Sequence, residues 1–213
     1  MSNSARQKLS GTVLALDVDG VLLDPDRAGK GPWQHSLRQT YGVDPTLLDG
    51  AFFARSWSDV IVGREAIEPA LERALVELGW EVDVEELLRC WFESDFELDH
   101  QVVDAAAGWI ESGITVVLVS NQEVRRARYL EQHLAASLRI DGFASSGALG
   151  VVKSDVAFYP AAEDLLGIDA GTRVVFVDDT LANVAAAKQH GWHGIHFVKT
   201  GRWQSEVDAA LAG

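Results

Sequence analysis

Hydrophobic residues along the chain gather in short runs rich in β-branched side chains, and helix-like segments separate these runs. Three runs are clear and two are weaker: TVLAL (12–16), ITVVLV (114–119), RVVFV (173–177), and residues 140–144 and 195–198. Between them, apolar residues recur with helical spacing in 103–110, 127–134, 158–165 and 183–191. Continuous apolar strands that alternate with helices are typical of a parallel sheet covered on both faces. We therefore predict an α/β protein with a Rossmann-like sheet and helices on both faces.

The pattern changes after the first strand, where helical stripes replace strand-like runs. Apolar residues recur every three or four positions in 67–78 and 84–91. Two polar segments flank this region, DPDRAGKGP (24–32) and ELDH (97–100). We predict a mainly helical unit inserted after the first strand and two domains in total: a core of residues 1–24 and 100–213, and a small helical domain of residues 25–99.

Composition and charge narrow the class of protein. Hydrophobic residues make up 47% of the 213 residues, enough for a sizeable core. Asp and Glu number 32 against 18 Lys and Arg, and this net charge of −14 disfavours nonspecific binding to nucleic acid or to anionic membranes. No apolar stretch approaches the roughly 20 residues of a membrane span, and the N-terminal apolar segment is too short for a signal peptide. The single cysteine, Cys90, excludes an internal disulfide. We expect a cytoplasmic protein, and the sequence does not predict its oligomeric state.

Polar side chains follow each of the three clear strands. The first strand is followed by Asp17 and Asp19, the second by Ser120 and Asn121, and the third by Asp178 and Asp179. Since ligands of open α/β sheets bind beyond the carboxyl ends of the strands, we expect these residues to meet at one edge. Four carboxylates at one edge require a cation, and ligands that are all oxygen select a hard one such as Mg²⁺.

The first acidic pair is arranged for acid–base chemistry. In extended backbone, residues i and i+2 point to the same side, so Asp17 and Asp19 can face one substrate. Repulsion between them is expected to raise the pKa of one, which suits a general acid. Gly20 permits the tight turn that this close approach needs.

These residues resemble the motifs of the haloacid dehalogenase-like (HAD) hydrolase superfamily, in the same order. The four matching segments are Asp17-Val18-Asp19-Gly20-Val21-Leu22, Val117-Leu118-Val119-Ser120-Asn121, Gly150-Val151-Val152-Lys153 and Phe176-Val177-Asp178-Asp179-Thr180-Leu181-Ala182-Asn183. Members of this superfamily are usually Mg²⁺-dependent phosphatases that act through an aspartyl-phosphate, and the inserted helices resemble the helical cap of its first cap class. The resemblance therefore implies a hydrolase of small phosphorylated metabolites.

The resemblance also implies roles for individual residues. Asp17 is the nucleophile and a metal ligand, and Asp19 is the general acid and base, with its backbone carbonyl on the metal. Ser120, the backbone amide of Asn121 and Lys153 bind the phosphoryl group, with Lys153 also neutralising Asp17. Asp179 is expected to contact Mg²⁺ directly and Asp178 through water, although the reverse assignment stays open.

Three alternatives remain beside this prediction. A phosphoryl-transfer mutase acting on a sugar phosphate would use the same residues. A metal-free dehalogenase typically lacks the second aspartate, so Asp19 argues against it. A noncatalytic regulatory module should have lost a catalytic residue, and the only departure from the motifs is Ser154, where proline is usual after the lysine.

Two further clusters are interpreted as structural. His190, His193 and His196 have the spacing of a metal site, but the glycines between them favour a turn. Arg125, Arg126 and Arg128 lie on the helix after Ser120, and we interpret them as a solvated helix face.

Overall fold

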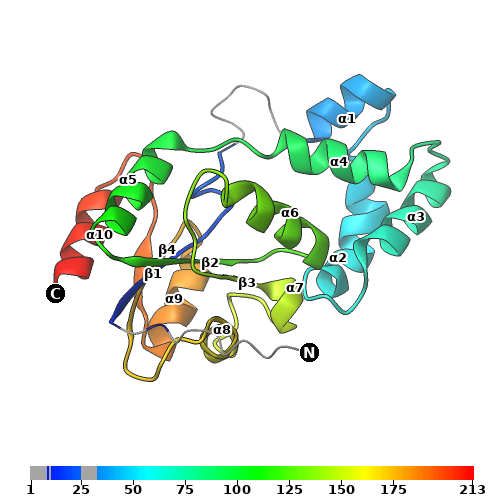
Figure 1. The fold of residues 1–213 in the computed structure, drawn as a ribbon. Coiled ribbons are helices and arrows are strands. Elements are labelled where there is room, and N and C mark those ends of the chain that lie inside the picture. The colour runs from blue at the N-terminus through cyan, green and yellow to red at the C-terminus, as the bar shows by residue number, and fades with distance from the viewer. Residues whose placement is uncertain (1–8, 10, 25–32) are drawn as a thin grey trace, which may run out of the picture.

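Five parallel strands form one sheet in the computed structural model, which describes residue 9 and residues 11–24 and 33–213. The strands are β1 (Thr12–Leu16), β2 (Thr115–Ser120), β3 (Phe143–Ser145), β4 (Arg173–Asp178) and β5 (His193–His196). Their order across the sheet is β3-β2-β1-β4-β5, so β1 is central (Figure 1). The predicted parallel α/β sheet is confirmed.

The strand register brings the predicted polar residues to one edge. Leu16 at the end of β1 pairs with Leu118 in β2 and with Val177 in β4. Asp17, the next residue, donates its backbone N–H to the carbonyl of Val177 at 3.0 Å. Because all strands run the same way, Asp17, Ser120 and Asp178 follow or end their strands at the same carboxyl edge.

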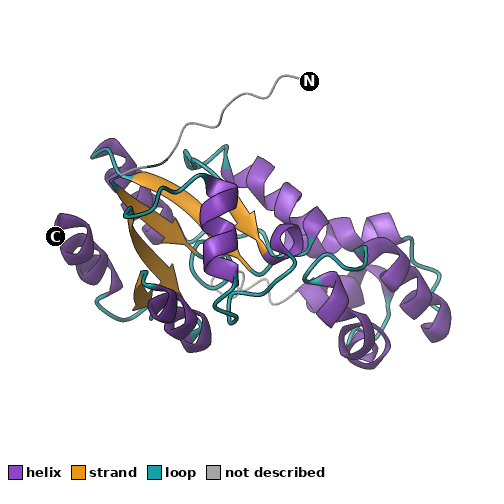
Figure 2. Cartoon of the chain, turned by 90° about the horizontal axis from the view of Figure 1, so that it is seen from below, coloured by secondary structure: helices purple, strands orange, loops and turns teal. Residues whose placement is uncertain are grey.

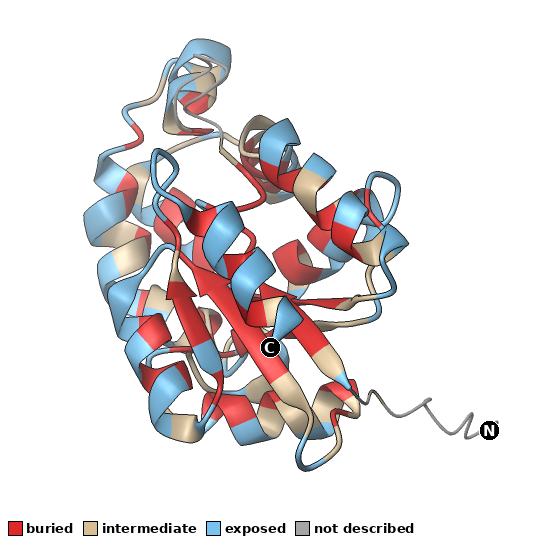
Figure 3. Ribbon diagram, turned by 90° about the vertical axis from the view of Figure 1, so that its left-hand side faces the viewer, coloured by how far each residue is buried: buried red, intermediate tan, exposed pale blue. Residues whose placement is uncertain are grey.

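Helices cover both faces of the sheet (Figure 2). Along β1, Leu14 and Leu16 belong to one apolar cluster, whereas Val13 and Ala15 belong to another. The first cluster includes residues of α5 (His100–Glu111), α6 (Val124–Leu134) and α10 (Trp203–Ala212), and the second those of α8 (Phe158–Leu166) and α9 (Leu181–His190). The strands are buried along most of their length (Figure 3) because apolar side chains leave the sheet on both sides.

The chain between β1 and β2 carries a second set of helices with its own apolar cluster. These are α1 (Trp33–Tyr41), the π-helix η2 (Asp49–Phe53), α2 (Ala54–Val60), α3 (Ile67–Leu78) and α4 (Val84–Ser94), and we call residues 33–94 the helical segment. Leu37, Phe52, Leu71 and Leu88 are among the buried residues of this cluster. Figure 1 shows the segment beside the carboxyl edge of the sheet. The predicted domain boundaries stay a prediction, and their residues 25–32 lie outside the described residues.

Two backbone segments connect the core to the helical segment, and they form hydrogen bonds with each other. Asp24 donates its backbone N–H to the carbonyl of Glu97, and Asp99 donates to the carbonyl of Leu22, each at 2.8 Å. Lys199 forms ion pairs with both Asp24 and Asp99. The two connections to the helical segment are therefore tied to each other and to the core.

Some elements differ from those the pattern predicts. The weak strands predicted at 140–144 and 195–198 are β3, which begins at Phe143, and β5, which begins at His193. β5 has the sequence HGIH and lies at one edge of the sheet. Its two end residues, both histidines, are not buried, so this strand lacks the continuous apolar run of the central strands. Among the described helices, none has the length and apolar character that crossing a membrane requires.

Candidate active site

Lys153 lies at the centre of the residues that follow the strands. Its Nζ atom lies 2.6 Å from Oδ1 of Asp17 and 2.7 Å from Oδ2 of Asp178, and only 1% of the residue is exposed. Burial alone would lower the pKa of Lys153, but the two carboxylates reverse this and raise it. A permanent positive charge therefore separates two buried acids that would otherwise repel each other.

The backbone around Lys153 is fixed by its neighbours. Its N–H donates to Oδ1 of Asn121 at 2.9 Å, and its carbonyl accepts from the hydroxyl of Tyr159 at 2.8 Å. That hydroxyl also lies 2.7 Å from the carbonyl of Asn183 in α9. Lys153 thus reaches the site although Ser154 follows it in place of proline.

Asp178 is fully buried and its carboxylate has several donors. Besides Lys153, it accepts from the backbone N–H of Thr180 at 2.7 Å and from Nδ2 of Asn183, which lies 3.1 Å from both oxygens. These donors replace the water that the buried carboxylate has lost. Asp178 therefore serves to hold Lys153 and the start of α9 in place.

Asp179 is exposed and has fewer side-chain contacts. Its Oδ1 accepts from the hydroxyl of Thr180 at 3.1 Å, and burial and the charge of Asp178 raise its pKa. Its Oδ2 lies so near Gly20 that a Cβ there would be 2.2 Å away, and Gly20 has φ +78°. Glycine is thus required at position 20 both by the turn and by the approach of Asp179.

Asp17 is 5% exposed, and its two oxygens differ in their contacts. Oδ1 accepts from the backbone N–H of Val18 at 2.7 Å and faces Lys153. Oδ2 takes no hydrogen bond from the described residues. Burial raises the pKa of Asp17 to about 7 against the opposing charge of Lys153, with a further contribution from Asp178.

Asp19 is held by Arg126 in α6 and by Gln122, which precedes that helix. Nη1 of Arg126 lies 2.7 Å from Oδ2 and Nη2 lies 2.9 Å from Oδ1, while Nε2 of Gln122 donates to Oδ2 at 2.6 Å. Although burial acts to raise the pKa of Asp19, Arg126 and Gln122 outweigh it and lower that pKa. Of the two acids, Asp17 is therefore the one with the raised pKa, and burial is the main cause while the charge of Asp19 contributes least.

Arg126 was expected on a solvated helix face, and this interpretation is wrong. Only 7% of Arg126 is exposed, and its guanidinium points inward to Asp19. Gln122 had no predicted role, yet Nε2 of its side chain also lies 3.3 Å from the hydroxyl of Ser120, which is buried. No local pattern marks these two residues, because Gln122 precedes α6 and the inward direction of Arg126 depends on how that helix is rotated about its axis.

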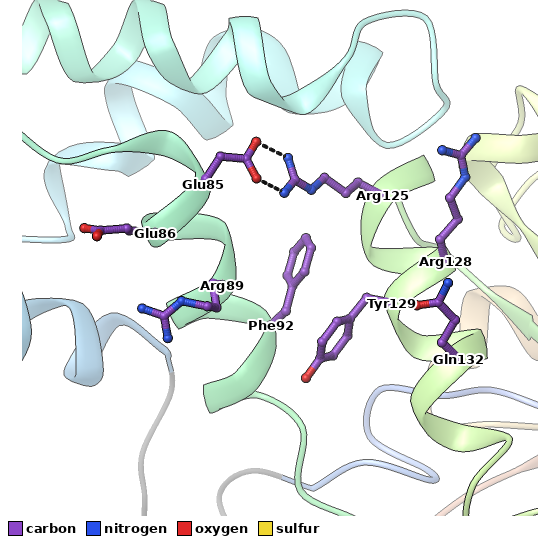
Figure 4. A pocket seen from close by; sticks show the side chains of 8 residues that line it. All are labelled: Glu85, Glu86, Arg89, Phe92, Arg125, Arg128, Tyr129 and Gln132. Carbon is purple, nitrogen blue, oxygen red and sulfur yellow. Dashed lines mark hydrogen bonds and ion pairs between the residues drawn. The ribbon is translucent and has the colours of Figure 1, made fainter.

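Arg125 points to the opposite side, toward the helical segment. Its guanidinium pairs with both oxygens of Glu85 in α4, and its Nη1 lies 2.9 Å from Oε1 of Glu68 in α3. Figure 4 shows the pair of Arg125 with Glu85, with the rings of Phe92 and Tyr129 nearby. These four residues are among those that line a pocket of about 450 Å³. The first turn of α6 therefore contacts the helical segment through one arginine and Asp19 through the next.

The site fits a hard cation. Asp17, Asp178 and Asp179 each offer a carboxylate oxygen, and these oxygens lie within 4.8 Å of one another. Oxygen ligands of this kind are typical of Mg²⁺. The three histidines do not converge in the same way: His190 lies 3.1 Å from Glu163, His193 is exposed, and His196 is 2.9 Å from the carbonyl of Asp179.

The parallel sheet carries buried acids and a buried lysine at the carboxyl ends of its strands. This arrangement places the protein among the α/β proteins that bind their ligands at this edge of the sheet. A family model described as haloacid dehalogenase-like hydrolase matches residues 12–191. The chain belongs to this hydrolase family, as the motifs in its sequence predict.

Solved structures share this fold at low identity. A HAD family enzyme from Bacteroides thetaiotaomicron, in a variant form complexed with magnesium and inorganic phosphate, is 14% identical with a TM-score of 0.71; the alignment covers 93% of this chain and 99% of that one. A 2-haloacid dehalogenase from Pseudomonas syringae pv. tomato DC3000 is 18% identical with a TM-score of 0.68, covering 96% and 99%. A search of curated proteins finds no match.

Proposed function

We propose that the protein is a Mg²⁺-dependent hydrolase of small phosphate monoesters that acts through an aspartyl-phosphate on Asp17. The observation that carries this proposal is the contact of Lys153 with Asp17 and Asp178. A buried cation 2.6 Å from Oδ1 leaves Oδ2 of Asp17 as the oxygen for attack, with positive charge beside it.

The proposed reaction has two displacements at phosphorus. Oδ2 of Asp17 attacks phosphorus, the ester P–O bond breaks, and the leaving oxygen takes a proton from the protonated form of Asp19. Water then attacks the phosphorus of the aspartyl-phosphate, gives a proton to Asp19, and Asp17 leaves as a carboxylate. The pairing of Asp19 with Arg126 corresponds to the ionised form, which is the one that the second displacement needs.

The remaining residues bind the phosphoryl group and the metal. Ser120, the backbone amide of Asn121 and Lys153 are assigned to the phosphoryl oxygens. Asp17, the backbone carbonyl of Asp19 and Asp179 are assigned to Mg²⁺, with Asp178 acting through water because Lys153, Thr180 and Asn183 already bind its oxygens. Bound Mg²⁺ supplies positive charge that offsets the charge of the phosphoryl group.

The substrate is proposed to be a small phosphorylated metabolite. The helical segment, as part of a cap of residues 25–99, is proposed to close over it and exclude bulk water. The magnesium and phosphate complex of the Bacteroides thetaiotaomicron enzyme favours phosphate chemistry for this fold. The likeness to the Pseudomonas syringae dehalogenase keeps carbon–halogen hydrolysis as the competing reaction, against which Asp19 argues.

The test is phosphate release from a generic aryl phosphate, with Mg²⁺ and with excess chelator. We expect release that requires the metal. Chloride release from a 2-haloacid in the presence of chelator would instead support the dehalogenase, and phosphoryl transfer to an added sugar phosphate would support the mutase. No reaction in any assay, together with no Mg²⁺ binding, would support the noncatalytic module.

Asp179→Ala is expected to weaken Mg²⁺ binding by roughly tenfold or more, because an exposed carboxylate facing the site is lost. The Mg²⁺ dependence of phosphate release and calorimetric titration of Mg²⁺ both measure this. Asp104→Ala, which removes an exposed acid on α5, is the control and should leave the affinity unchanged. If Asp179→Ala left the affinity for Mg²⁺ unchanged, the direct contact would be assigned to Asp178 instead.

A further inference from the structure

Asp19 has a fixed side-chain position although nearly half of its side chain is exposed. Its exposed fraction is 47%, against 8% for the side chain of Arg126 that binds it. An exposed carboxylate ordinarily samples several rotamers, and fixing it has an entropic cost. Here Arg126 binds both oxygens of Asp19 and Gln122 binds one of them, so that the carboxylate has one orientation relative to Asp17.

The two residues that donate to Asp19 contact each other, and one of them also contacts the hydroxyl of Ser120, which is predicted to bind phosphate. Oε1 of Gln122 accepts from Nη1 of Arg126 at 2.9 Å, which orients the amide so that its Nε2 faces Asp19. The same Nε2 lies 3.3 Å from the hydroxyl of Ser120. A planar guanidinium that binds a carboxylate through two parallel hydrogen bonds fixes direction as well as distance.

The backbone that carries these donors is itself fixed. Glu123 caps the start of α6, and its carboxylate accepts from the backbone N–H groups of Arg125 and Arg126. The carbonyl of Gln122 accepts from the backbone N–H of Gly147 at 2.9 Å, and a Cβ on Gly147 would lie 2.8 Å from that carbonyl oxygen. Little room is left for the turn before α6 to move relative to the sheet.

We propose that Arg126 and Gln122 are positioning residues for Asp19, which they hold where it exchanges protons with the reacting oxygens. This inference rests on the proposed function, because it assigns to Asp19 the proton transfers of the phosphatase reaction. Arg126 is buried, and among the described residues its guanidinium forms hydrogen bonds with Asp19 and Gln122 alone, so its effect on turnover passes through Asp19.

A double-mutant cycle tests this assignment, with phosphate release from an aryl phosphate at saturating Mg²⁺ as the measurement. Arg126→Gln should lower kcat about 10- to 100-fold while KM changes less than about twofold, since a misplaced proton donor affects turnover more than binding. Arg126→Lys should lose less, because it keeps the charge. In the Asp19→Asn background, Arg126→Gln should change kcat by less than about twofold.

Arg128→Gln is the matched control, because this exposed arginine lies on the same helix two positions further on. It should keep the wild-type kcat. Circular dichroism checks that each variant is folded, and if Arg126→Gln does not fold, Gln122→Ala takes its place in the same cycle.

The outcomes separate this inference from the proposed function. If Arg126→Gln lowered kcat by the same factor in the wild-type and Asp19→Asn backgrounds, Arg126 would support the fold or contact the substrate itself. That result would overturn the inference. An active wild type with an equally active Arg126→Gln would overturn it as well while leaving the phosphatase in place. An inactive wild type would reject the proposed function and this inference together.

Discussion

Asp17→Asn is expected to abolish Mg²⁺-dependent phosphate release, lowering kcat by roughly 10⁴-fold or more, because an amide cannot form the aspartyl-phosphate. Lys153 and Asp178 stay in contact in this variant, so the site should keep its shape. The measurement is single-turnover and steady-state phosphate release beside the wild type. A variant that keeps most of its activity would contradict the assignment of Asp17 as nucleophile.

The same substitution should change how stability depends on pH. In the folded, metal-free protein, burial raises the pKa of Asp17 to about 7 from its ordinary value of 3.8. A group whose pKa is raised by folding favours the folded state fully below its unfolded pKa, and this contribution is lost as the pH rises through the folded pKa. We therefore expect the wild type to lose a few kcal/mol of unfolding free energy between about pH 4 and pH 7 from this residue.

Asp17→Asn should lack that part of the pH dependence and be more stable than the wild type at pH 8. Urea unfolding with chelator present, measured from pH 5 to pH 8, tests this. Asp104→Asn on α5 is the control, since this acid is exposed. Parallel stability curves for the wild type and Asp17→Asn would show that burial does not raise the pKa of Asp17.

The sheet and the meeting of its strand ends were predictable because both follow from local patterns. Buried parallel strands show as continuous apolar runs, and residues after such strands share one edge whatever the rest of the chain does. Asp17 and Asp178 could therefore be placed near each other although 160 residues separate them. Lys153 required the motif resemblance, since a loop lysine gives no sign in the sequence of being buried between two acids.

The contacts of Asp19 were not predictable in the same way. Three arginines within four positions have the pattern of a solvated helix face, and the pattern does not state which one points inward. Their directions depend on how α6 is rotated about its axis. That rotation is set by the cap at Glu123 and by Leu130 and Leu134, which belong to the same apolar cluster as Leu14 and Leu16 of the sheet. Arg125 consequently contacts the helical segment and Arg126 contacts Asp19.

The two acids of the last motif also differ for reasons that are not local. Asp178 and Asp179 are neighbours in sequence, yet one ends β4 facing Lys153 and Asn183 and the other lies against Gly20. Successive residues of a strand point to opposite sides, which separates their surroundings. The expectation that Asp179 contacts the metal directly and Asp178 through water stays a prediction, and Asp179→Ala tests it.

Lys153→Met is expected to have the largest effect on stability of any single change in the site. Methionine has a similar length and no charge, so the substitution leaves Asp17 and Asp178 buried without their shared cation. Removing one partner of a buried ion pair costs about 3–5 kcal/mol, because the remaining charge has neither water nor a counterion. Phosphate release should be lost as well. Urea unfolding at pH 8 with chelator present measures the stability.

The pH and a second substitution show whether charge causes this loss. The charge of Lys153 holds the pKa of Asp17 down, so without Lys153 that pKa rises further, and protonation of Asp17 at pH 5 should recover part of the lost free energy of unfolding. Adding Asp17→Asn should recover part of it at pH 8, giving a double variant that is more stable than the sum of the two changes predicts. Lys188→Met on α9, an exposed lysine, should leave stability nearly unchanged. If the loss were the same at pH 5 and pH 8, and additive with Asp17→Asn, the packing of the lysine chain rather than its charge would hold the site together.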